Sequence, residues 1–448
     1  MTKGLLAALA LAVGMTGAWA AGTAPANPPI VVYLGASLID GTGVGLQPNM
    51  AIVTEGARIL AVAPAANFKA PKGAEIVNIG GKFIIPGLIN SHVHLATTAD
   101  PADAKAYLRR DIYSGVTTVR DMAGDTRLLG ELKREAEFDE IPSPDIYYAA
   151  LMAGPAFFKD PRTHAAARGL VAGEVPWMQA INAETNMPLA VAEAKGTGAT
   201  AIKIYADLPA PLIDAITAEA HRQHMLVWAH GAVFPARPSD NVAAGVDVVS
   251  HACMLGYQVS NPMPQEYHNR AAVDAASLLK PNAQLTGLLA DMKRRGTILD
   301  ATVYVYEEIW REPHTSAPYC TLELAERITG MAHRAGIPIS TGTDGESSWK
   351  NAYSAIDSEL ELLVNKSGIA PLDAIRSATA VGARTVGQEK NMGTVEPGKL
   401  ANFVVLAKNP LDNISNIRSV NITVKHGIRY PRSAYIPIAK DEVKHESE

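Results

Sequence analysis

Short apolar runs recur along the chain, and each one ends in polar or small residues. GVTTVRD, ATAIKIY, VDVVSH and IPISTGTD are rich in β-branched residues and short, which is typical of buried β-strands that run into loops. The pattern predicts eight strands of this kind. They are expected at residues 88–94, 116–121, 145–150, 201–205, 226–230, 248–251, 297–304 and 337–344.

Segments with helical periodicity lie between these runs. DAKAYLRRDIYSG, PAPLIDAITAEAHRQH and LELAERITGMAHRAG are examples. Alternating strands and helices predict a parallel sheet whose crossovers are helical. About eight such units over roughly 300 residues fit a (β/α)8 TIM barrel, an α/β fold. In such a barrel the carboxyl ends of all strands surround one mouth, so distant residues meet there.

Polar side chains close several of the expected strands. His92 and His94 are two positions apart, so their imidazoles point to the same face of a strand and can converge on one metal ion. An isolated His-x-His pair is more often an ordinary polar strand end. Four further residues at strand ends change this balance, and we expect all six side chains to share one cavity. The four are Lys203, His230, His251 and Asp344.

Composition fits an enzyme subunit with a small-molecule or short-peptide substrate. The 448 residues carry 40 Lys and Arg against 45 Asp and Glu, a net charge of −5, and no basic patch interleaved with aromatic residues. These features exclude nucleic acid as a partner. The length is common for barrels that form one domain. A homo-oligomer is possible, and the sequence allows a dimer or a larger ring equally well.

The first residues have the pattern of an export signal. Lys3 precedes the apolar run LLAALALAVGM, and residues 18–20, Ala-Trp-Ala, match a small-x-small cleavage site. A membrane anchor is the alternative, but the apolar run is shorter than the roughly 20 residues that a span needs. We therefore expect a signal peptide at 1–20, a flexible leader at 21–29, a secreted or periplasmic protein, and a charged tail at 437–448.

The chain has two cysteines, Cys253 and Cys320. In an oxidising compartment they can form one disulfide. A chain of this length does not need a disulfide for stability, and Cys253 lies close enough to His251 to be a buried thiol near the mouth. The sequence leaves both interpretations open.

The six residues and their flanking motifs resemble the binuclear metal centre of the amidohydrolase superfamily. The resemblance rests on His-x-His in the first strand, Lys in the fourth, His in the fifth and sixth, and Asp in the eighth. GKFIIPGLINSHVHL is similar to the start of that superfamily's barrel. The motifs GVTTVRD and IKIY look most like its imidazolonepropionase-like and Xaa-Pro dipeptidase-like branch.

Segments outside the barrel extend the resemblance. VVYLGASLIDGTG and ARILAVAP look like the first half of the superfamily's small β-domain, and the stretch from DAIRSATAVGARTVG to LANFVVLAKNPLDNI looks like its last helix and return strands. The resemblance implies a small β-sandwich domain built from residues 30–85 and 395–436, with the barrel at 86–394.

The resemblance also implies the cofactors. A lysine ammonium is a poor ligand because it is cationic; in the superfamily CO2 converts this lysine to a carbamate that bridges two divalent transition-metal ions, with Zn²⁺ as the expected metal. The implied ligands are His92, His94 and Asp344 on one ion, His230 and His251 on the other, and carboxylated Lys203 between them.

A water shared by two such ions becomes hydroxide near neutral pH. Asp344 can take its proton and return it to the departing nitrogen. Tyr205, two residues after Lys203 and on the same face, can donate its hydroxyl to the oxyanion, or can simply be a packing residue. The expected reaction is the cleavage of an amide or peptide-like C–N bond in a dipeptide, an N-acyl amino acid or a related amide by a metal-bridged hydroxide.

Substrate residues are less well defined by the sequence. A long loop after the third strand carries His164, and the segment VYVYEEIWREPH carries Tyr304 and Arg311. Long loops at a barrel mouth are usually functional, and an arginine can bind a carboxylate, although a solvated arginine is more common. The third strand lacks the Gly-His-Gly segment of dipeptidase-like relatives, so their substrate does not transfer directly.

Three alternative functions stay open. A lactone or ester hydrolase can use the same barrel and ligands. A ring deaminase of this superfamily typically has Glu three residues after the histidine of the fifth strand, where this chain has Val233, and lacks the lysine of the fourth strand. A non-catalytic scaffold usually loses metal ligands, whereas here every expected position is filled.

Overall fold

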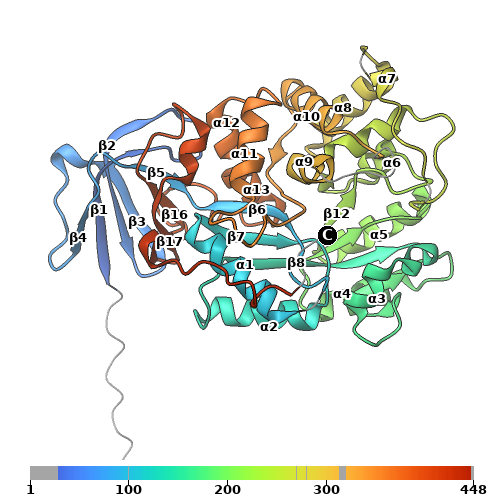
Figure 1. The fold of residues 1–448 in the computed structure, drawn as a ribbon, viewed down its shortest axis with the longest axis horizontal. Helices are drawn as coiled ribbons and strands as arrows, with labels where there is room; N and C mark the ends of the chain where they lie inside the picture. The colour runs from blue at the N-terminus through green and yellow to red at the C-terminus, as the bar shows by residue number, and fades with distance from the viewer. Residues whose placement is uncertain (1–28, 99, 269, 279, 312–318, 445–448) are drawn as a thin grey trace, which may run out of the picture.

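The computed structural model describes residues 29–98, 100–268, 270–278, 280–311 and 319–444. The predicted signal peptide and almost all of the predicted leader, as well as the last four residues of the predicted tail, lie outside the described residues. Two sheets organise the rest (Figure 1).

Eight parallel strands form the barrel in the order in which they occur along the chain. The Ser91 N–H donates to the Thr341 carbonyl at 2.8 Å, which brings the last strand back beside the first and nearly closes the barrel. The predicted TIM barrel is confirmed. Its strands are β6 (Leu88–Val93), β7 (Val116–Asp121), β8 (Asp145–Ala153), β11 (Ala201–Ile204), β12 (Leu226–His230), β13 (Val248–Ser250), β14 (Ile298–Asp300) and β15 (Ile339–Ser340).

Helices surround the barrel and bury their apolar sides against it (Figure 1). α10 shows how the sequence sets their limits: the Thr321 side chain accepts from the Leu324 N–H at its start, and Gly336 ends it in the left-handed conformation at φ 84°. The main helices are α1 (Pro101–Tyr113), α2 (Thr126–Glu137), α4 (Met187–Gly196), α5 (Ala210–Arg222), α6 (Pro238–Ala244), α8 (Ala283–Arg295), α10 (Leu322–Ala335), α11 (Ile356–Asn365), α12 (Pro371–Arg376) and α13 (Gly382–Thr385).

Both ends of the chain build the second, mainly antiparallel sheet, at one end of the molecule (Figure 1). Antiparallel pairing of β5 with β16, in which Phe83 faces Leu406, joins the amino-terminal strands to the carboxyl-terminal ones. This confirms the predicted small β-domain made from both terminal segments. Its strands are β1 (Ile30–Leu38), β2 (Gln47–Glu55), β3 (Arg58–Pro64), β4 (Glu75–Asn78), β5 (Phe83–Pro86), β16 (Phe403–Leu406), β17 (Val420–Lys425) and β18 (Ile428–Pro431).

Two predicted strands extend several residues beyond the real ones. The strand predicted at 297–304 stops at Asp300, and helix α9 (Val303–Arg311) follows. The Glu359 carboxylate accepts the Val303 N–H at 3.1 Å and the Tyr304 N–H at 2.5 Å, which caps the start of that helix. The strand predicted at 337–344 shortens to β15, and the chain turns away before Asp344.

Cys253 and Cys320 form a disulfide, which resolves the choice that the sequence left open. The bond joins the 3₁₀ turn η3 (Ala252–Val259), directly after β13, to the residue before the cap of α10. It therefore fastens the segments that follow two adjacent strands of the barrel. In the described part of the chain, no helix combines the length and the apolar character that a membrane span requires.

Candidate metal centre

The six residues singled out in the sequence lie at the carboxyl ends of their strands. Lys203 and His230 lie in β11 and β12, and His92 lies in β6. His94 and His251 directly follow their strands, and Asp344 lies in the turn after β15. The backbone is strained at the same end of the barrel. Among the described residues, six of the eleven non-glycine residues with positive φ follow barrel strands there: Ala123, Asp207, Phe234, His251, Thr302 and Asp344. Such strain is concentrated at functional sites because surrounding contacts must hold it.

Asp344 is the centre of the cluster. One of its oxygens lies 3.0 Å from His94 Nε2 and 3.2 Å from His92 Nε2, and the other lies 3.5 Å from His251 Nδ1. Ligand atoms of His92, His251 and Asp344 all lie within 4.8 Å of one another. Two imidazoles and a carboxylate at these separations can hold a transition-metal ion.

His230 and Lys203 complete the arrangement. The His230 ring packs against the His251 ring at 4.6 Å between centroids, and its Nδ1 bonds the Ala232 carbonyl at 3.0 Å, which leaves Nε2 free. Lys203 is fully buried, and its Nζ has no hydrogen-bond partner among the described residues. Burial, reinforced by the charge of Arg120, lowers the pKa of Lys203 to about 7. The Lys203 amine is therefore easily deprotonated, and no described residue accepts a hydrogen bond from it.

The electrostatics of the cluster separate two kinds of histidine. Burial holds the pKa of His230 and of His251 well below the usual range, so both stay neutral and keep a lone pair. Burial acts in the same direction on His92, but the carboxylates of Asp344 and Asp300 outweigh it and raise the pKa. For Asp344, burial alone would raise the pKa, yet His92 and His251 bring it well below its ordinary value.

Asp300 and Arg120 were not predicted from the sequence. The fully buried Asp300 carboxylate, at the end of β14, bonds His92 Nδ1 at 2.7 Å, Arg120 Nη2 at 2.9 Å and Ser250 Oγ at 3.0 Å. An acceptor at Nδ1 fixes the tautomer and orientation of His92 and points Nε2 at Asp344. A signal did exist, because Asp300 closes the apolar run TILD as the other site residues close theirs.

Tyr205 faces the cluster. Its ring stacks on His230 at 4.9 Å and on Phe157 at 4.5 Å, and its hydroxyl lies 3.4 Å from the Tyr267 hydroxyl. Tyr267, which sequence reasoning missed because it lies in a segment without periodicity, also contacts the His230 ring at 5.6 Å. The two tyrosine hydroxyls are hydrogen-bond donors next to the candidate metal ligands.

The three suggested substrate residues are placed differently. His164 is exposed on α3 (Pro161–Ala167). Tyr304 is buried in α9, with its ring beside Gly345. Arg311, at the end of α9, is 60% exposed and pairs with Glu307 and Glu308. The structure thus brings Tyr304 close to the cluster through Gly345, whereas none of the contacts of His164 or Arg311 reach it.

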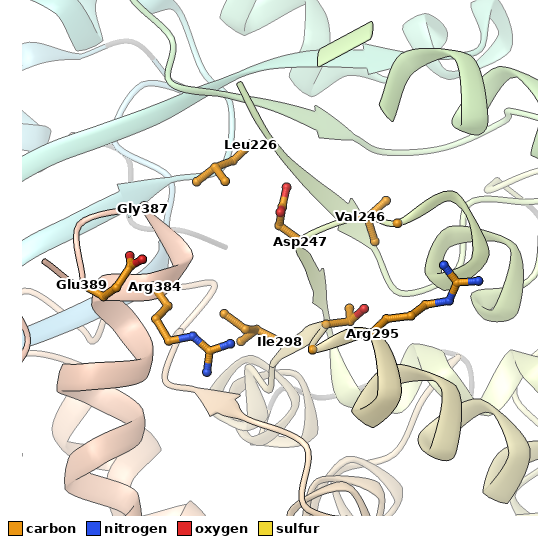
Figure 2. Close-up of a pocket in the computed structure, with 11 residues that line it drawn as sticks. Leu226, Val246, Asp247, Arg295, Ile298, Arg384, Gly387 and Glu389 are labelled. Atoms are coloured by element: carbon orange, nitrogen blue, oxygen red, sulfur yellow. The ribbon is translucent and has the colours of Figure 1, made fainter. Parts of the chain in front are cut away.

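A hollow of about 280 Å³ lies at the opposite end of the barrel (Figure 2). It is lined by Leu226, the first residue of β12, and by Asp247 and Thr297, which precede β13 and β14. The candidate ligands lie at the other ends of these strands, as His230 ends β12. We call this cavity the rear hollow; because it contains none of the candidate ligands, it is separate from the candidate centre.

The fold and the site define a class of protein, and comparison with known proteins identifies the family. A (β/α)8 barrel with histidines and a carboxylate at its mouth defines a barrel hydrolase. Residues 83–309 and 319–429 match the amidohydrolase family. Imidazolonepropionase of Streptomyces griseus subsp. griseus is 25% identical over 389 residues, 83% of this chain and 88% of that protein. 5-Methylthioadenosine/S-adenosylhomocysteine deaminase of Symbiobacterium thermophilum is 31% identical over 131 residues, 26% of this chain and 30% of the deaminase.

Solved structures share the fold. A Xaa-Pro dipeptidase with bound methionine in its active site matches 90% of this chain and 100% of its own, with a TM-score of 0.71 and 20% identity. The chain belongs to the amidohydrolase family, and it is a hydrolase that acts on carbon–nitrogen bonds. These relatives agree with the imidazolonepropionase-like and Xaa-Pro dipeptidase-like resemblance of its motifs.

Proposed function

We propose that this protein is a binuclear metal-dependent amidohydrolase that cleaves the amide or peptide-like bond of a dipeptide, an N-acyl amino acid or a related amide. The observation that carries the proposal is the fully buried Lys203 Nζ, which has no hydrogen-bond partner among the described residues and lies close enough to His230, His251 and Asp344 to interact with them electrostatically. An unpartnered buried ammonium is costly. A carbamate would replace it by two oxygen ligands for cations.

The side chains present suit two divalent transition-metal ions, with zinc as the expected metal. His92, His94 and Asp344 would hold one ion, and His230 and His251 the other, with carboxylated Lys203 between them. Neutral imidazoles and carboxylates are the ligands that such ions prefer. When bound, the ions would activate a water molecule and polarise the substrate carbonyl.

The protein's own groups would move the proton and hold the substrate. Asp344, ionised because its pKa is low, takes a proton from the attacking water and delivers it to the leaving nitrogen. The hydroxyl part of the water joins the acyl carbon, the C–N bond breaks, and a carboxylic acid and an amine result. The Tyr205 hydroxyl donates a hydrogen bond to the carbonyl oxygen as negative charge develops there.

The alternatives differ in specific residues. Deamination is disfavoured because Val233 occupies the position of the usual glutamate and because Lys203 is present. A scaffold without catalysis is disfavoured because every ligand position is filled. A lactone or ester hydrolase would use the same groups, and a panel of matched amides, esters and lactones separates these activities by rate.

Export completes the proposal. It is supported by Lys3, the apolar run and the Ala-Trp-Ala site at 18–20, and by the Cys253–Cys320 disulfide, since such bonds persist in oxidising compartments. The mature secreted or periplasmic protein should begin at Ala21 or within a residue or two of it. Amino-terminal sequencing checks this, and an intact Met1 outside the cytoplasm would contradict it.

Lys203→Ala tests the bridging carbamate. The variant should bind less metal and lose activity, and acetate or propionate should partly restore both by filling the vacated space. A ¹³C carbamate signal after labelling with bicarbonate should appear in the wild type and be absent from the variant.

Lys425→Ala is the matched control, because Lys425 is also fully buried but bonds the Ala136 carbonyl at 2.9 Å. Its variant should respond to neither carboxylate. Wild-type activity in Lys203→Ala would remove the bridge from the mechanism.

A further inference from the structure

The arginines around the mouth of the barrel differ in whether they have partners. Arg162 binds Asp160 through two bonds, at 3.0 and 2.7 Å, and Arg120 binds Asp300. Arg311 is occupied by Glu307 and Glu308. Each of these arginines is already paired with a carboxylate of the protein, which competes with any carboxylate of a ligand.

Arg270 is the exception. It lies between η3 and α8 and makes no ion pair within the part of the chain that the structure describes. Its guanidinium carbon lies 4.2 Å from the centre of the Tyr267 ring and 4.1 Å from that of Tyr319, so two aromatic rings pack against the group. Nη1 donates to the Tyr267 carbonyl at 2.6 Å, while Nε is buried without a partner. A buried donor without an acceptor destabilises the folded protein.

Tyr267 connects Arg270 to the candidate centre. Its ring contacts the His230 ring at 5.6 Å, and its hydroxyl lies 3.4 Å from that of Tyr205. Its backbone N–H is anchored by Asp207 Oδ1 at 2.7 Å.

We infer that Arg270 binds a carboxylate of the substrate. A guanidinium offers its donors in its own plane, two rings restrict the movement of this one, and a carboxylate matches a planar pair of donors. The inference rests on the proposed function and narrows it. The preferred substrates carry a free carboxylate on the carbon next to the scissile nitrogen, as N-acyl amino acids and dipeptides do, whereas neutral amides and aryl amides are poor substrates.

Binding of a matched pair of probes tests the inference separately from catalysis. The probes are N-acetyl-L-phenylalanine and its carboxamide, measured by calorimetry on the zinc-loaded protein in an Asp344→Asn background, where turnover is slow. The acid should bind about 10- to 100-fold more tightly, the worth of a charge-assisted contact. Arg270→Gln should bring this ratio close to one, and Arg311→Gln should leave it unchanged. Circular dichroism and metal content verify that each variant is folded and loaded.

Three results would overturn the role of Arg270: equal binding of both probes, no measurable binding of the acid, or an unchanged ratio in Arg270→Gln. The turnover of wild-type protein on the same amides tests the proposed function. Hydrolysis without preference for acids would keep the proposed function and remove the role of Arg270. An Arg270-dependent preference in binding, without hydrolysis of any amide, would do the reverse.

Discussion

The two ends of the barrel differ in what they bury. The carboxyl-terminal end contains Lys203, Asp300 and Asp344 among histidines, with residues in left-handed conformations around them. The rear hollow at the other end is lined by the exposed arginines Arg295 and Arg384 and by Asp247, a third exposed and bonded to His221 at 3.0 Å.

The presence of a cavity alone would select the wrong end. The rear hollow measures about 280 Å³, but Arg295 and Arg384 are exposed and Asp247 is paired with His221, so none of these charges is buried without a partner. At the mouth, buried charges and strained backbone cost free energy that only a function explains. Buried polar groups without partners therefore indicate a functional site more reliably than an empty cavity does.

The largest effect should come from Asp344. Asp344→Asn keeps the shape of the side chain but cannot accept the proton, so kcat should fall by about 10²- to 10⁴-fold. Steady-state kinetics on a hydrolysed amide measures this loss. Arg384→Ala in the rear hollow is the control and should change kcat/KM by less than about 2-fold, as surface substitutions do. Equal losses in the two variants would end the distinction between the two ends.

Glu359 should make the stability of the folded protein decrease at alkaline pH. Burial raises its pKa to about 8, although the N–H groups of Val303 and Tyr304 oppose the shift. The folded state then holds a proton that the unfolded state releases near pH 4.5, so stability falls as pH rises between these two values, by up to about 1.4 kcal/mol per unit.

Urea unfolding of the metal-free protein at pH 6 and pH 9 measures the change in the free energy of unfolding. Comparison with Glu359→Gln separates the contribution of Glu359 from that of the candidate metal ligands. The variant should lose roughly 2–3 kcal/mol less than the wild type between these pH values. Identical slopes would mean that Glu359 is ionised in the folded protein throughout.

Asp300 should have the smallest effect of the three mouth residues. In Asp300→Asn the amide oxygen still accepts from His92, but the negative charge that balances Arg120 is lost. Metal affinity should fall by about 10- to 100-fold, the usual cost of disturbing a group that orients a ligand. Competition with a chelator measures it. An unchanged affinity together with reduced stability would make Asp300 a packing residue only.

The barrel and the strand-end residues were predictable because both follow from local pattern. His92, Lys203 and His230 each end an apolar run, and alternation with helices places such ends at one mouth. That these residues bind metal remains a prediction. Asp300, the partner of His92, was not predicted because VYVY after it has the composition of a strand.

The strand predicted at 297–304 ends early because of a contact that is distant in sequence. Glu359 caps the first turn of α9 from 56 residues further along the chain, and this contact outweighs the local preference for a strand. Tyr267 and Arg270 lie in a segment without periodicity, so only the tertiary structure reveals that their side chains meet and that the Tyr267 ring contacts His230. Pattern thus predicts the barrel and its strand ends, whereas contacts between loops require the folded chain.

The disulfide has a consequence for the integrity of the chain. Cys253 and Cys320 are 67 positions apart, with His251 before the first and Asp344 after the second. A protease that cuts once between the two cysteines would therefore produce two polypeptides that stay covalently joined, with candidate ligands of the metal centre on each. Such a nicked protein would migrate as one band until a reductant is added, and the integrity of its active site would then depend on the oxidation state of its surroundings.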